Sequence, residues 1–194
     1  MTDDETAATK KYDKILKTDE AVFTFRMNPI LLYDKDYDKN ILVITPFVEE
    51  FLESIFDFAE GIVAAGGIVK NDKGELLLIH RRGYWDMAKG KVEKGEKIIA
   101  AAKREVEEET GVRVDRVEED FVKTYHCYVQ KGRNLIKETY WYYMFSNDKS
   151  TLIPQIEEDI IEVKWASKEE ILRLEKEFYP LIFGLLRTVL AINS

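Results

Sequence analysis

The spacing of apolar residues along the chain predicts short strands separated by turns, with helices at a few places. Residues 1–11 are polar and acidic and are expected to be disordered. Residues 12–60 are expected to form a small N-terminal α/β unit, because short apolar runs alternate there with turn residues. A helix is predicted from Pro46 onward, since aromatic and aliphatic residues recur there at helical spacing. The strands expected in this unit cover residues 21–26, 30–33 and 41–44.

The longer unit, residues 61–194, combines strand patterns with a central helix. That helix is predicted to end at Gly111, because an alanine run flanked by Lys and Glu favours helix and a glycine can close the last turn. Residues 151–159 are expected to be a loop. The predicted strands of this unit cover residues 62–70, 75–82, 121–129, 135–145 and 160–165.

Two more helices are expected near the C-terminal end. Ser167, with Glu170 three residues later, resembles a capping box that opens a helix running towards Phe178. Pro180 separates this helix from a last apolar helix that ends near Ile192. Strands before and after a central helix, followed by terminal helices, predict an α+β fold of the sandwich type.

The predicted strand 135–145 alternates in a way that leaves its orientation open. Lys137 and Trp141 share one face, whereas Glu138 and Tyr140 share the other. One face is expected to form core. The other could present a lysine and aromatic rings to a phosphate chain and a base.

Composition and charge narrow the class of protein. The 194 residues are 45% hydrophobic and 34% charged, as in ordinary globular proteins. No apolar run is long enough to span a bilayer, and residues 1–11 lack the apolar segment of a signal peptide, so no membrane association is expected. The single cysteine, Cys127, excludes an internal disulfide and fits a reducing compartment, so a cytoplasmic location is expected. A net charge of −8 argues against broad nucleic-acid binding.

Candidate chemistry lies on the central helix and on the loop before it. Glu105, Glu108 and Glu109 are spaced so that their carboxylates converge on one helix face. Such carboxylates repel one another unless a positive charge lies among them, and Mg²⁺ prefers oxygen ligands of this kind. Gly90 and Gly95 are expected to let the loop turn tightly where its backbone approaches the metal or phosphates.

The whole stretch from Gly90 to Val112 resembles a family signature, the Nudix box. The match runs Gly90, five residues, Glu96, seven residues, Arg104-Glu105-Val106, any residue, Glu108-Glu109, any residue, Gly111-Val112. The resemblance implies an α/β/α sandwich with a mixed sheet. It also implies a hydrolase that cleaves a nucleoside diphosphate linked to another group.

The resemblance further implies roles for the charged residues of the box. Mg²⁺, or Mn²⁺ in its place, is expected to be held by Glu105, Glu108 and Glu109, and the resemblance points most directly to Glu105 and Glu109. Arg104 is expected to point away from the metal face. In the family it pairs with the carboxylate at Glu96, which supports the loop against the helix.

The residues upstream of the box bear on the substrate. The segment Trp85–Lys91 resembles the approach to the box in diadenosine-polyphosphate and diphosphoinositol-polyphosphate hydrolases. Met87 stands for the usual Leu and Ala88 for the usual Pro. Loss of that proline should loosen the loop, but Lys89 and Lys91 remain as charges that can bind phosphate. Tyr128, sixteen positions after Val112, stands where diadenosine-polyphosphate members carry a tyrosine, and packing in the sheet is its alternative role. The residues expected to bind substrate are Arg81, Lys89, Lys91, Tyr128 and Lys137.

The box does not identify the general base. Glu157, Glu158 and Glu162 lie downstream in the expected loop and strand, and Glu158 is the catalytic candidate among them. Ordinary exposed acids are the alternative reading of all three. Glu108 as the base, or a metal-bound water without a dedicated base, also remains open.

The leading hypothesis is a Mg²⁺-dependent pyrophosphohydrolase whose partner is a nucleotide-derived pyrophosphate, most directly a dinucleoside polyphosphate. Two other functions stay open. One is house-cleaning hydrolysis of non-standard nucleoside triphosphates, and the other is a non-catalytic Nudix module that senses a ligand or binds a partner. Residues 12–60 could pack against the main domain, shape a rim of the site or form a homodimer.

Overall fold

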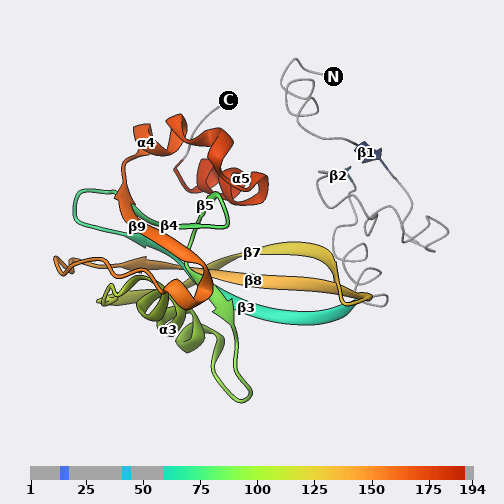
Figure 1. Ribbon diagram of the computed structural model, residues 1–194, viewed down its shortest axis with the longest axis horizontal. Helices are drawn as coiled ribbons and strands as arrows, with labels where there is room; N and C mark the ends of the chain where they lie inside the picture. Colours follow the sequence, from blue (N-terminus) through green and yellow to red (C-terminus); the bar gives the residue numbers. More distant parts are fainter. Residues whose placement is uncertain (1–13, 18–40, 45–58, 191–194) are drawn as a thin grey trace. The chain divides into compact units, whose positions relative to one another are not determined.

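The structure is a computed structural model that describes residues 14–17, 41–44 and 59–190 (Figure 1). The chain separates into two compact units. One unit contains residues 1–62, 125–137 and 194, and the other contains residues 63–124 and 138–193. Several predictions lie outside the described residues: the disordered segment 1–11, the strands 21–26 and 30–33, the helix from Pro46 and the helix end near Ile192.

The first unit contains a two-stranded parallel sheet formed by β1, Lys14–Lys17, and β2, Ile41–Ile44. The strand β2 was predicted, whereas β1 was missed because Lys14–Lys17 has only two apolar residues and no turn signal on both sides. The end of a long hairpin, residues 125–137, also belongs to this unit. There His126 lies 5.2 Å from Tyr128 between ring centroids.

The second unit is organised around a seven-stranded sheet whose order is β5-β4-β3-β8-β7, with β6 paired to β3 and β9 paired to β4. The four longer strands predicted between residues 62 and 145 are confirmed. Two three-residue strands, β5 and β6, were not predicted. The strands are β3 Glu60–Lys70, β4 Leu76–Arg81, β5 Tyr84–Asp86, β6 Lys89–Lys91, β7 Arg116–Gln130, β8 Arg133–Phe145 and β9 Ile160–Ala166.

The helix α3, Ile98–Thr110, covers one face of the sheet (Figure 1). It buries Ala101, Ala102 and Val106 in a core shared with β3, β4 and β8. The helix ends at Gly111, whose φ of 71° is the left-handed conformation that glycine adopts without strain. The predicted central helix and its glycine stop are therefore confirmed.

The opposite face of the sheet is covered by α4, Lys168–Arg173, and α5, Pro180–Val189 (Figure 1). Oγ of Ser167 accepts a hydrogen bond from the backbone N–H of Glu170, as a capping residue should. The Glu170 carboxylate bonds to Lys164 Nζ at 2.6 Å, so half of the expected capping box forms. The helix predicted to reach Phe178 ends earlier, and a 3₁₀ turn, Glu175–Glu177, replaces its last part. The predicted α/β/α sandwich is confirmed.

Both faces of β8 pack in core. Trp141 is 1% exposed in the cluster under α4 and α5, and its indole N–H donates to Oγ1 of Thr124. Tyr142 and Met144 are buried in the cluster under α3. The expectation that a single face of this strand forms core is wrong in the second unit, because helices cover both sides of the sheet.

The expected loop 151–159 contains a short 3₁₀ helix, η2, Ile156–Glu158. It ends at Asp159, whose φ of 60° turns the chain into β9. No helix within the described ranges is both long and apolar enough to cross a membrane.

Candidate active site

The loop before α3 and the helix itself meet at Gly90. This residue lies in β6, where it pairs with Ala65 of β3. A Cβ atom on Gly90 would stand 2.0 Å from Oε2 of Glu105, so only glycine leaves room for that carboxylate. The expected role of Gly90 in a tight turn is therefore wrong. Glycine is required at this position because the Glu105 carboxylate approaches the backbone so closely. The tight turn falls at Gly95, whose φ is 83°.

Arg104 joins the loop to the helix. Its Nε and NH2 donate to the two carboxylate oxygens of Glu96 at 2.8 and 2.9 Å, which confirms the expected pairing. With the Glu93 backbone N–H as a further donor, this guanidinium lowers the pKa of Glu96 to about 2. The expectation that Arg104 points away from the glutamate face is wrong. Its NH1 also donates to Glu105 at 2.7 Å and to Glu108 at 2.9 Å.

Glu105 and Glu108 thus share one cationic neighbour, as their predicted position on one helix face allows. The Glu108 side chain is half exposed, whereas that of Glu105 is largely covered. Burial raises the pKa of Glu105, although Arg104 acts in the opposite direction. Glu105 is therefore a carboxylate whose negative charge is only partly compensated.

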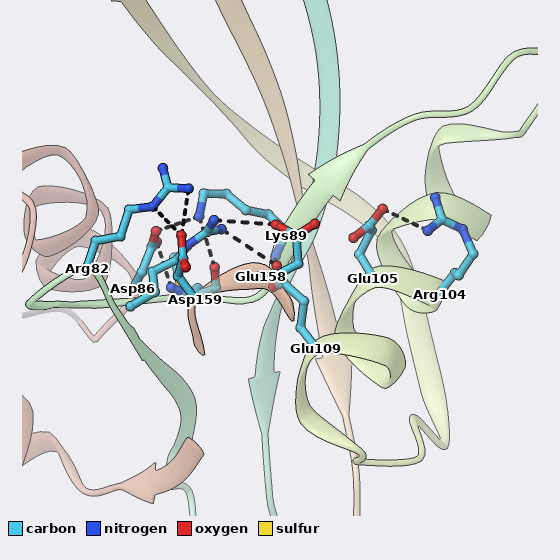
Figure 2. Close-up of polar contacts among 10 residues, drawn as sticks. Arg82, Asp86, Lys89, Arg104, Glu105, Glu109, Glu158 and Asp159 are labelled. Carbon is cyan, nitrogen blue, oxygen red and sulfur yellow. Dashed lines mark hydrogen bonds and ion pairs between the residues drawn. The ribbon is translucent and has the colours of Figure 1, made fainter. Parts of the chain in front are cut away.

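Glu109 is the most buried carboxylate of the site, at 1% exposure. Its Oε2 accepts a hydrogen bond from the backbone N–H of Lys89 at 2.8 Å (Figure 2). Its Oε1 lies 3.7 Å from NH1 of Arg81. Burial raises the pKa of Glu109 to about 7, and Lys89 and Arg81 offset only part of that effect. A cation placed here would relieve the cost of the buried charge.

Arg81 links Glu109 to the 3₁₀ turn η2. Its NH2 lies 3.6 Å from Oε2 of Glu158, so one guanidinium lies between the two carboxylates. The next residue, Arg82, donates from Nε and NH2 to Oδ2 of Asp159 at 3.0 and 2.9 Å (Figure 2). Two adjacent arginines therefore contact two adjacent acids. Of the three acids downstream of the box, Glu158 is therefore the one that this arrangement brings to the site.

Asp86 is a site residue that sequence reasoning missed. It is 3% exposed, and its Oδ2 accepts a hydrogen bond from Lys89 Nζ at 2.5 Å. Its Oδ1 accepts from the backbone N–H of Met87 at 2.7 Å. The Lys89 ammonium is thus paired within the chain, while Lys91 is exposed. A charged residue between Trp85 and Met87, both of which are core residues, is the signal that could have indicated Asp86.

The segment before the box is packed despite the absence of the usual proline. Met87 and Ala88 are 1% and 2% exposed. The carbonyl of Ala88 accepts a hydrogen bond from the Gly67 backbone N–H at 3.2 Å. Of the other predicted substrate residues, Tyr128 and Lys137 lie together in the first unit, with Lys137 Nζ 5.8 Å from the Tyr128 ring centroid. Their part in substrate binding stays a prediction.

The carboxylate oxygens of this site are the type of ligand that a hard divalent cation prefers. Glu105 and Glu109 offer carboxylate oxygens whose raised pKa values indicate incompletely compensated charge. Within the part of the chain that the structure describes, no three His, Cys, Asp or Glu side chains are arranged to hold a metal ion. Glu105 and Glu108 are turned to Arg104, so both would have to rotate to share a cation with Glu109.

A curled sheet between helices, with these carboxylates beside arginine and lysine, is the setting of phosphate-anhydride chemistry. The family comparison agrees: the NUDIX domain matches residues 62–186, more than half of the chain. The chain belongs to the Nudix family. It is a hydrolase that acts on pyrophosphate bonds.

Individual proteins show the same likeness. An uncharacterized Nudix hydrolase of Listeria innocua is 35% identical over 123 residues, which cover 58% of this chain and 69% of that protein. The solution structure of the E. coli ORF135 protein is 28% identical with a TM-score of 0.51, covering 69% of this chain and 91% of that one. A crystal structure of a C. elegans Ap4A hydrolase binary complex is 24% identical with a TM-score of 0.54, covering 67% and 96%. At that identity the last likeness shows the fold alone.

Proposed function

We propose that the protein is a Mg²⁺-dependent pyrophosphohydrolase that cleaves a nucleoside diphosphate linked to another group, with dinucleoside polyphosphates as the substrate class. The observation that carries the proposal is the buried carboxylate of Glu109, held beside Glu105 on the box helix and contacted by Lys89 and Arg81. Mn²⁺ would suit the same oxygen donors.

The residues that would hold the cation are Glu105, Glu108 and Glu109. When bound, it would neutralise charge on adjacent phosphates and lower the pKa of an attacking water. Arg104 would then keep its two hydrogen bonds to Glu96 while releasing Glu105 and Glu108. Glu96, Arg104 and Gly90 thereby hold the loop and helix in position around the ligands.

The positively charged side chains around Glu109 would bind the phosphates of the substrate. Arg81 is covered, at 15% side-chain exposure, and a guanidinium in such a place can bind two phosphate oxygens at once. Lys89 also lies close, and its pairing with Asp86 fixes where its ammonium is presented. Lys91, on the same short strand, is exposed and would act at longer range. These three residues would orient the anhydride for attack.

Glu158 is the proposed general base. Its side chain is 56% exposed, which gives water access, and Arg81 connects it to Glu109. It would accept the proton of the attacking water, and Arg81 would keep the carboxylate directed into the site. Glu108 is the alternative base, because it is also half exposed and lies on the box helix.

The substrate class is supported by the residues that flank the box. The Lys-Gly-Lys entry at Lys89–Lys91 and the tyrosine at Tyr128 resemble those of dinucleoside-polyphosphate hydrolases. Lys137, whose Nζ lies 5.8 Å from the Tyr128 ring centroid, is proposed together with Tyr128 as a substrate-binding residue. Cytoplasmic location and homodimerisation through residues 12–60 remain proposals that rest on the sequence.

A substrate panel with Mg²⁺ tests the function. It would contain diadenosine polyphosphates, nucleoside triphosphates, nucleotide sugars and diphosphoinositol polyphosphates, in water labelled with heavy oxygen to identify the phosphorus attacked. We expect the highest kcat/KM for a diadenosine polyphosphate. Preference for nucleoside triphosphates would replace the substrate class with the house-cleaning one. No turnover of any compound, in wild type that binds Mg²⁺ by calorimetry, would contradict the catalytic proposal.

A further inference from the structure

Two tyrosine rings stack beside the site without a role in the chemistry described so far. Tyr84, at the start of β5, and Tyr179, directly before α5, have ring centroids 4.5 Å apart and planes 30° apart. Tyr84 is 42% exposed, and Tyr179 covers one face of its ring. A stacked pair with one ring exposed presents an aromatic surface of fixed orientation.

Tyr84 lies at the edge of the sheet beside Arg81, the arginine proposed to bind phosphate. In the β4–β5 hairpin, Tyr84 is directly opposite Arg81, and Ile79 is opposite Asp86. Opposite residues of an antiparallel pair project from the same face, so Tyr84 projects on the face from which Arg81 reaches Glu109. Burial is the largest cause that raises the pKa of Tyr179, and the negative charge of Asp86 raises it further. Tyr179 therefore lies close to Asp86, which agrees with this placement.

The rings are held in place by the core behind them. Trp85, next to Tyr84, forms an isolated parallel bridge with Phe178, next to Tyr179. Both Trp85 and Phe178 are buried, at 4% and 3% exposure. The bridge holds the backbone next to each of the two rings, so a ligand that stacks there would not have to order that backbone.

We propose that the exposed face of Tyr84, supported from behind by Tyr179, is the platform on which a nucleobase of the substrate stacks. Arg81 lies between this platform and Glu109, so a phosphate bound by Arg81 would connect the base to the reacting anhydride. The inference rests on the proposed function, because it names the base-binding end of the same site. It requires a nucleoside in the substrate, since an inositol ring has no aromatic face to stack.

Binding of ADP and of inorganic pyrophosphate, each with Mg²⁺, separates the base from the phosphates without turnover. Tyr84→Leu should weaken ADP binding roughly tenfold, the scale of losing one stacked base, and leave pyrophosphate binding unchanged. Tyr84→Phe keeps the ring and should bind ADP as wild type does. Phe121→Leu is the matched control, because Phe121 is also an exposed aromatic residue of the sheet, at 43%. The Phe121→Leu variant should bind both ADP and pyrophosphate as wild type does.

Unchanged ADP binding by a folded Tyr84→Leu variant would overturn the platform, and so would equal losses of ADP and pyrophosphate. If Tyr84→Leu does not fold, photolabelling of wild type with 8-azido-ADP decides the matter. Labelling of the peptide that contains Tyr84 supports the platform, and labelling only elsewhere overturns it. Turnover on the substrate panel with unchanged ADP binding by the variant would reject the platform and keep the proposed function.

Discussion

The backbone N–H of Lys89 donates a hydrogen bond to Oε2 of Glu109, 2.8 Å away and twenty positions along the chain. This contact joins β6 to the last turn of α3. The carboxylate it holds is 1% exposed, and burial raises its pKa to about 7. The chain therefore keeps a carboxylate where its ionised form is poorly solvated, which lowers the stability of the metal-free protein and is the reason for proposing a cation there.

Stability of the metal-free protein should fall as the pH rises. The pKa of Glu109 in the folded protein lies above its ordinary value of 4.5, so its contribution to stability is fully present below about 4.5 and is lost as the pH passes through about 7. The loss between these limits should be on the order of 3 kcal/mol, taking 1.36 kcal/mol per pKa unit. Urea denaturation in chelator at pH 5 and pH 8 measures it.

Glu109→Gln is the variant that isolates this effect, because an amide oxygen can still accept the Lys89 hydrogen bond without carrying charge. In chelator its free energy of unfolding should change much less between pH 5 and pH 8 than that of wild type. With Mg²⁺ and substrate, its turnover should fall by orders of magnitude. An equal pH dependence in the two proteins would show that other groups cause the loss.

Gly90→Ala should damage activity more than stability. The added Cβ would meet the carboxylate of Glu105, which lies at the end of a flexible side chain and can rotate away. We expect kcat/KM to fall roughly 10- to 100-fold, as for other changes that misplace a ligand, with little change in the urea midpoint.

The matched control is Gly184→Ala in α5, where a Cβ would meet nothing within 4 Å. It should raise stability by about 0.5–1 kcal/mol through helix propensity and leave activity unchanged. A Gly90→Ala enzyme as active as Gly184→Ala would disprove the close-approach role of Gly90.

Arg104→Lys should destabilise the metal-free protein. A lysine keeps the charge but cannot contact both oxygens of Glu96 together with Glu105 and Glu108. Loss of these charge-assisted hydrogen bonds should cost about 1–2 kcal/mol in chelator. Arg116→Lys, whose guanidinium is 67% exposed and lies 3.4 Å from Glu118, should change stability by less than about 0.5 kcal/mol. Equal effects of the two substitutions would count against Arg104 as the link between loop and helix.

Glu158→Gln should lower kcat by roughly 10²- to 10⁴-fold if Glu158 is the general base, with a small change in KM. Glu157→Gln changes the same charge in the same 3₁₀ turn and should keep kcat near wild type. A normal rate for Glu158→Gln would reject Glu158 as the base and leave Glu108, or a metal-bound water without a dedicated base, in its place.

The elements with long, regular patterns were predictable. The alanine run, the Gly111 stop and the box spacing were enough to predict α3, and the pairing of Arg104 with Glu96 followed from the family resemblance. The short strands β5 and β6 were not predictable, because three residues are too few to establish a period. Their existence depends on pairing with β4 and β3, which are set by the fold as a whole.

The finer parts of the site depend on contacts between distant residues. The need for glycine at Gly90 arises from the Glu105 carboxylate, fifteen positions later, and no local pattern encodes that proximity. Asp86 escaped notice because a single aspartate after Trp85 has no periodic or spacing signal. The direction of Arg104 was misjudged because one guanidinium serves three carboxylates at once.

The same guanidinium has a consequence for the life of the protein in a cell. Arg104 supplies a positive charge to Glu105 and Glu108 from within the chain, so these carboxylates have a partner as soon as the helix docks on its loop. We therefore expect newly made chains to reach the native state before the proposed ion binds, and we expect removal of divalent ions to stop turnover without exposing the chain to proteolysis. Returning the ion should restore activity with no refolding step.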